Sequence, residues 1–143
     1  MGITVSPSSA RLCQRFDEGT ANLLPLLKSA SVEFLHNAPI PLTGLSTGHI
    51  PLGMDVLPMD NSDTKKEGVS YTYKGHDGYS PMADHMGQQG WCLGCELRPS
   101  SKHANSEFIS VLTRIIPRAR QLTDQSILIR LDSAHDALEN RIF

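Results

Sequence analysis

The sequence lacks any hydrophobic run approaching the roughly 18 residues that a membrane-spanning helix needs. Its first residues, "MGITVSPSSARLCQRF", lack the basic and then apolar regions of a secretory signal. Only three cysteines are present, an odd number that argues against a disulfide framework and favours reduced thiols in a cytoplasmic setting. Neither sign of charge dominates, since the formal net charge is -2. We therefore expect a cytoplasmic protein without a membrane partner and without a general attraction to nucleic acid.

The composition is that of an ordinary folded domain, with 39% apolar and 20% charged residues in a chain of 143. Apolar residues recur at helical spacing between residues 8 and 38, but Gly19 and Pro25 weaken the middle of this stretch. Two short helices fit the pattern as well as one, and we expect short N-terminal helices. A Pro- and Gly-rich linker follows. We divide the chain into an N-terminal helical segment and linker, 1–47, and a core, 48–143.

The core reads as a mixed α/β sheet. Strand patterns cover residues 49–60, 79–87 and 91–98, and the last two are joined by a hairpin turn at "QQG". An amphipathic helix over residues 105–122 and the strand "SILIRLD" follow, and a further helix begins at residue 133. Three antiparallel strands, a helix and a strand returning in parallel predict a layered α/β fold.

Two carboxylates mark the ends of predicted strands. Asp55 and Asp132 each follow an apolar run, and ligands of an open α/β sheet gather at the carboxyl ends of its strands. Two adjacent carboxylates repel unless a cation lies between them. Mg²⁺, which prefers oxygen ligands, or Mn²⁺ is the natural partner, and such a site suits phosphoryl transfer. An acid at a strand end is also common in caps and turns.

Several long motifs surround these two aspartates. Together they resemble the catalytic core of DDE-type insertion-sequence transposases, the bacterial "transposase DDE domain, group 1" family. "RLCQRFDE" resembles the helix that precedes this core, so the similarity covers essentially the whole chain. The matching pieces are Gly48-His49, Asp55-Val56, Asp60-Asn61-Ser62, Thr64 to Ser70, Thr72 to Gly75, Asp77 to Tyr79, Glu96 to Arg98 and Arg130 to Ser133.

The resemblance implies an RNase H-like fold in which Asp55 and Asp132 are the first two catalytic acids and hold Mg²⁺ or Mn²⁺. The implied activity is cleavage and strand transfer of double-stranded DNA at insertion-sequence terminal repeats, in the bacterial cytoplasm at the nucleoid. The family's third acid, a Glu, lies well downstream of the second, and Glu139 is too close to Asp132 to replace it. We therefore expect a truncated copy. Its exposed apolar surface, on the central strand and the helix at 105–122, would favour marginal stability or self-association.

The chain departs from the family pattern beside both acids. Gly53 stands where the family commonly has Asp, and Leu57 where it has Ser or Thr. Tyr71 replaces a common Arg, and "DSAHD" replaces "DSGND". These changes suggest relaxed constraint. The alternative function is a catalytically inactive remnant that at most binds DNA or a full-length transposase.

Other residues have both a functional and an ordinary interpretation. Lys65, Lys66, Tyr73 and Lys74 could contact DNA phosphates and bases, although lysine-rich loops are usually solvated surface. Asp136 could support the metal site, or it could simply be an acid in the first turn of a helix. Cys92 and Cys95 have the C-x-x-C spacing of zinc sites, but the strand pattern places them on opposite faces.

Overall fold

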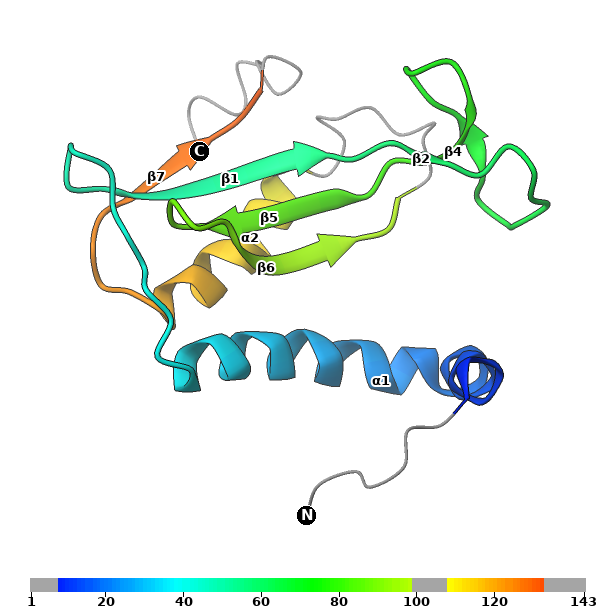
Figure 1. Ribbon diagram of the computed structural model, residues 1–143, viewed down its shortest axis with the longest axis horizontal. Coiled ribbons are helices and arrows are strands. Elements are labelled where there is room, and N and C mark those ends of the chain that lie inside the picture. Colours follow the sequence, from blue (N-terminus) through cyan, green and yellow to red (C-terminus); the bar gives the residue numbers. More distant parts are fainter. Residues whose placement is uncertain (1–7, 99–107, 133–143) are drawn as a thin grey trace.

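A computed structural model describes residues 8–98 and 108–132 of the chain. Its main element is a four-stranded mixed sheet in the order β6-β5-β1-β7 (Figure 1). The strands are β1 (Ile50–Val56), β5 (Met82–Met86), β6 (Trp91–Glu96) and β7 (Ile127–Arg130). β1 pairs antiparallel with β5 and parallel with β7, and β5 pairs antiparallel with β6. The predicted set of three antiparallel strands and one parallel strand is confirmed.

The N-terminal segment forms one helix, α1 (Ser9–Asn37), and not the short helices expected from the sequence. Gly19 and Pro25 both lie inside it, and Figure 1 shows its first turns end-on while the remainder runs lengthwise. The prediction of short helices was wrong because a proline can bend a helix without ending it. Val32 and Leu35 of α1 are buried, whereas Leu26 and Phe34 are exposed.

The second helix, α2 (Phe108–Arg120), covers one face of the main sheet (Figure 1). Its buried side chains are those of the predicted apolar stripe, and they pack against β1, β5 and β6 through Ile50, Leu52, Met82 and Leu93. The expectation of exposed apolar surface on this helix was therefore wrong. Exposed apolar side chains lie instead on α1 and at β7, where Leu128 is 42% exposed.

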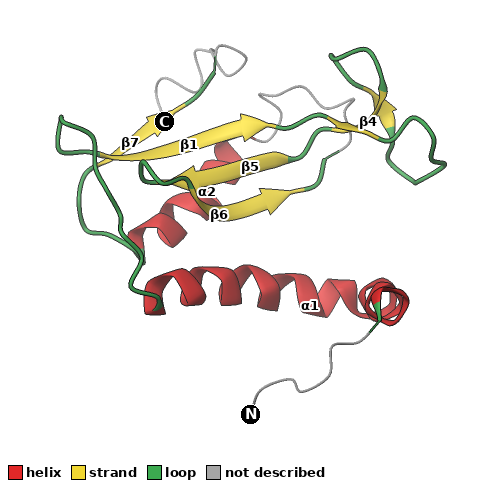
Figure 2. Cartoon of the chain, in the orientation of Figure 1, coloured by secondary structure: helices red, strands yellow, loops and turns green. Residues whose placement is uncertain are grey.

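A small second sheet follows the carboxyl end of β1. It consists of β2 (Met59–Asp60), β4 (Asp77–Tyr79) and β3 (Ser70–Tyr71) in the order β2-β4-β3, all antiparallel. Figure 2 shows this sheet beyond the end of the main one, with loops at its outer side. Residues 61–78, which lie between two of the strand patterns in the sequence, supply β3 and part of β4.

The turn between β5 and β6 and the linker before β1 support each other. Gly87 and Gly90 both have positive φ, 74° and 73°, which glycine adopts at little cost. The N–H of Gln88 donates to the carbonyl of Thr43, and Trp91 Nε1 donates to the carbonyl of Pro41 at 2.9 Å.

In the part of the chain that the structure describes, no helix has the length and hydropathy needed to cross a membrane.

Candidate metal and nucleic-acid site

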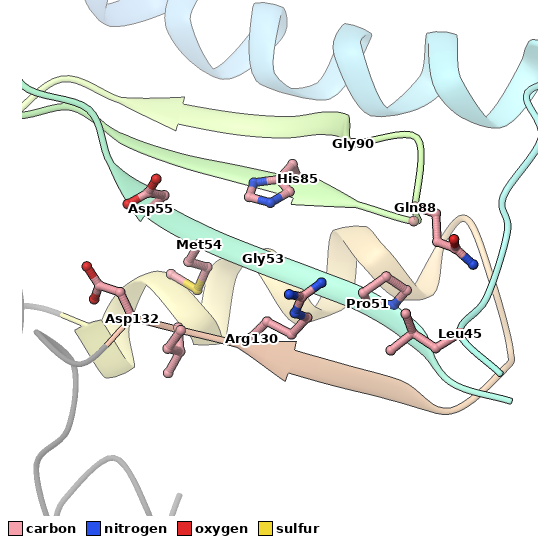
Figure 3. A pocket seen from close by; sticks show the side chains of 12 residues that line it. Leu45, Pro51, Gly53, Met54, Asp55, His85, Gln88, Gly90, Arg130 and Asp132 are labelled. Carbon is pink, nitrogen blue, oxygen red and sulfur yellow. The ribbon is translucent and has the colours of Figure 1, made fainter. Parts of the chain in front are cut away.

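Asp55 and Asp132 meet at the carboxyl end of the parallel pair β1 and β7. Gly53 of β1 lies beside Arg130 of β7, and each aspartate is two residues further along its own strand direction. Residues two apart share a face of the strand, so the two carboxylates project from the same side and the same edge. Figure 3 shows them side by side at that end of the sheet. The structure thus brings together two residues that lie far apart in the sequence.

Both aspartates line an open pocket of about 540 Å³ on the face opposite α2 (Figure 3). Both are exposed. The Oδ1 atom of Asp55 accepts a hydrogen bond from the N–H of Val56 at 2.8 Å, which helps to fix this carboxylate at the strand end. Since the carboxylates are accessible and adjacent, the remaining oxygen lone pairs can receive a cation from solvent.

The same pocket contains a guanidinium and an imidazole, from Arg130 and His85. His85 of β5 and Arg130 of β7 both pair with Gly53 of β1, so the three residues form one row across the sheet. A Cβ atom at position 53 would overlap the His85 ring, so the absence of a side chain there lets the imidazole lie over β1. In Figure 3 the Arg130 side chain extends toward the same strand.

The predicted DNA-contacting residues lie on the second sheet and its loops. Lys65, Lys66, Tyr73 and Lys74 are all exposed, and none of them lines the pocket. The Lys74 ammonium lies 5.2 Å from the centre of the Tyr73 ring, within cation–π range. The Tyr79 hydroxyl donates to the carbonyl of Glu67, which ties the lysine-bearing loop to β4.

A separate polar cluster lies on the helix-facing side of the sheet. Asp84 is completely buried, and neither of its carboxylate oxygens has a hydrogen-bond partner among the residues that the structure describes. Burial, and after it the charge of Glu96, raises the pKa of Asp84 to about 7, against the opposing effect of Arg118 and Arg114. This acid faces away from Asp55, because alternate residues of β5 point to opposite faces.

Glu96 of β6 joins both helices to the sheet. Arg114 of α2 donates to its two oxygens at 3.2 and 2.8 Å, and Lys28 of α1 lies 3.3 Å from Oε1. Burial alone would raise the pKa of Glu96, but the Arg114 hydrogen bonds and the Lys28 charge outweigh it and lower the pKa below the usual value. This cluster therefore contributes to stability and lies apart from the pocket.

The sequence interpretation missed two residues of the pocket and the buried acid on the opposite face of the sheet. His85 and the buried Asp84 were not singled out, and Arg130 was noted only as part of a motif. Arg130 could have been found, because it lies two residues before Asp132 and so shares its face. His85 could not, because its place over Gly53 depends on the register between β5 and β1. Asp136 lies outside the described residues.

The donor set fits a hard divalent cation in part. Two exposed carboxylates supply oxygen ligands of the kind that Mg²⁺ and Mn²⁺ prefer, with open space for water. Within residues 8–98 and 108–132, however, no group of three or more His, Cys, Asp or Glu side chains could hold a metal ion. Asp55 and Asp132 thus form a two-ligand arrangement in the described part of the chain.

Comparisons of the chain with protein-family models, with curated proteins and with solved structures find no match.

Proposed function

We propose that this chain carries part of the catalytic core of a DDE-type transposase, an RNase H-like domain that cuts and joins DNA. The observation that supports this most is the pairing of Asp55 with Asp132 at the carboxyl end of β1 and β7, in an open pocket. The resemblance of the motifs around both residues supports it independently, because the motifs do not depend on the strand register.

Asp55 and Asp132 would hold Mg²⁺ or Mn²⁺ between them. A metal ion bound there would polarise a phosphodiester oxygen and favour the hydroxide form of an attacking water. The part of the two side chains is to present anionic oxygens at one edge of the sheet, Asp55 from within β1 and Asp132 from two residues beyond the end of β7. The parallel pairing serves this role because adjacent backbones keep the two carboxylates in place without a ligand.

DNA would reach the pocket across the second sheet. The exposed side chains of Lys65, Lys66 and Lys74 lie on a part of the chain that directly follows the strand bearing Asp55. Lysine ammonium groups attract phosphates regardless of base sequence, and Tyr73 offers an exposed ring on which a base can stack. The double-stranded terminal repeats of an insertion sequence are the proposed substrate.

The alternative is an inactive protein that binds DNA or a full-length transposase without cutting. A specific observation favours it, namely that the described residues offer two acidic ligands and no third beside them. Two-metal phosphoryl transfer requires further ligands to fix both ions. Under this alternative the lysines and Tyr73 keep their function, and Asp55 and Asp132 lose theirs.

A nicking assay on supercoiled plasmid DNA separates the two functions. The full chain with Mn²⁺ is compared with its Asp55→Asn and Asp132→Asn variants, and DNA binding of all three is measured in parallel. Metal-dependent nicking that both substitutions abolish supports the catalytic function. DNA binding without nicking supports the alternative, and the absence of both overturns the proposal.

A further inference from the structure

The pocket has a cationic end as well as an acidic one. His85, Gly53 and Arg130 form one row across the sheet. Asp55 and Asp132 each come two residues after a member of this row, Gly53 and Arg130 respectively. Residues two apart in a strand are separated by roughly 7 Å. A group bound between the His85 ring and the Arg130 guanidinium would therefore lie next to whatever is bound between the two carboxylates.

The space directly over Gly53 is taken by the His85 ring, and the pocket that His85 and Arg130 both line is open beside that ring. No side chain occupies position 53, and the ring of His85 lies over the strand where a Cβ atom would otherwise stand. Across residues 8–98 and 108–132, the Arg130 side chain forms no hydrogen bond or ion pair with another side chain, although two carboxylates line the same pocket. The guanidinium is exposed and available to a ligand.

A guanidinium and an imidazole that line the same open pocket suit a phosphate group. The guanidinium presents parallel N–H donors that match two phosphate oxygens, and an imidazole N–H can donate to a third. We propose that Arg130 and His85 bind a phosphate of the nucleic-acid strand, adjacent to the phosphodiester that faces Asp55 and Asp132. This inference rests on the proposed function and adds to it a pair of substrate-positioning residues.

The negative charges of Asp55 and Asp132 should weaken the binding of an anion at this subsite. Without a metal, Asp55 and Asp132 repel a phosphate held about 7 Å away, so their replacement by Asn should strengthen phosphate binding. Replacement of Arg130 should weaken it. A general effect of net charge would give the same two signs, so the comparison that identifies a specific subsite is between Arg130→Gln and an Arg→Gln change elsewhere on the protein, since both lower the net charge by one unit.

The test is a titration of the full-length protein with inorganic phosphate in the presence of EDTA, followed by NMR chemical shifts of Gly53, His85 and Arg130. We expect affinity in the millimolar range. Arg130→Gln should weaken it about tenfold and His85→Gln by a smaller factor. Arg120→Gln, on the opposite face of the sheet, is the matched control and should leave the affinity unchanged. If Arg130→Gln does not fold, Arg130→Lys replaces it, since it keeps the charge and loses the paired donors.

A second arm identifies the source of the phosphate. A short single-stranded DNA oligonucleotide should displace inorganic phosphate from the wild-type protein. Phosphate binding that DNA does not displace would overturn the assignment to a nucleic-acid strand, and shifts indifferent to Arg130 and His85 would overturn the subsite. The proposed function is tested separately by Mg²⁺ binding. If the protein binds metal but Arg130→Gln does not change its phosphate affinity, the proposed function stands and the phosphate subsite is overturned. If the protein binds phosphate through Arg130 but binds no metal, the subsite stands and the proposed catalytic function is overturned.

Discussion

The imidazole of His85 fills the space that a side chain at Gly53 would need. The two residues are directly paired across β5 and β1, and a Cβ atom at position 53 would overlap the ring. The glycine is thus matched to the histidine on the neighbouring strand.

Gly53→Ala should destabilise the protein by about 1 kcal/mol or less, because the added methyl group displaces the His85 ring, which is exposed and can rotate toward solvent. Chemical denaturation measures the free energy of unfolding. The double variant Gly53→Ala, His85→Ala should recover part of the loss, since truncation of the ring makes room for the methyl group. Equal losses in the single and double variants would show that the two side chains do not compete for this space.

Asp84 should make stability fall as pH rises. Its pKa is raised to about 7 in the folded protein, above the usual 3.8, so the folded state holds a proton that the unfolded state releases. The stabilising effect of that proton is fully present below about pH 4 and is lost as the pH rises through 7. The slope is at most about 1.4 kcal/mol per pH unit.

Asp84→Asn should remove this slope, and at pH 8 the variant should be more stable than the wild type. Thermal or denaturant unfolding at a series of pH values measures the effect. Asp124→Asn, which changes an exposed acid after α2, is the control and should keep the wild-type slope. A slope that survives in Asp84→Asn would assign the pH dependence to other groups.

The pair Glu96 and Arg114 should couple β6 to α2 by about 1 kcal/mol, measured by a double-mutant cycle with Glu96→Gln and Arg114→Gln. The two hydrogen bonds of 3.2 and 2.8 Å form a paired arrangement, but Arg114 is partly exposed and salt should weaken it. Since the pKa of Glu96 is lowered from 4.5, its contribution is present above that pH and is lost as the pH falls below it. Additive effects of the two substitutions would contradict this coupling.

The lysines of the second sheet should determine how DNA binding depends on salt. Lys65→Gln, Lys66→Gln and Lys74→Gln should each weaken DNA binding and reduce the slope of log affinity against log salt by about 0.9. Fluorescence anisotropy with a labelled duplex at several salt concentrations measures both quantities. Arg120→Gln on α2 serves as the control, and a slope unchanged in all three lysine variants would exclude this surface from the DNA contact.

Most of the main sheet could be predicted from the sequence because its signals are local. The apolar runs that became β1 and β7 each end near an acid, and the stripe of Val111, Leu112 and Ile115 defines the buried face of α2. The parallel return of β7 followed from the intervening helix. These elements needed no knowledge of long-range pairing.

The remaining features depend on tertiary contacts that local patterns do not contain. α1 continues through Pro25, and its second half packs on the rest of the protein through Val32 and Leu35. The position of His85 depends on the β1–β5 register, and the burial of Asp84 depends on which face of β5 the helices cover.

The proximity of Asp55 and Asp132 was anticipated, since it required only that their strands be neighbours.

Calorimetric titration of the full chain with Mg²⁺ or Mn²⁺ tests most directly whether Asp55 and Asp132 form a metal site. We predict binding in the millimolar range or tighter that Asp55→Asn and Asp132→Asn each abolish, while Asp124→Asn leaves it intact. Absence of binding, or binding that neither substitution changes, would contradict the metal site and with it the proposed catalytic function.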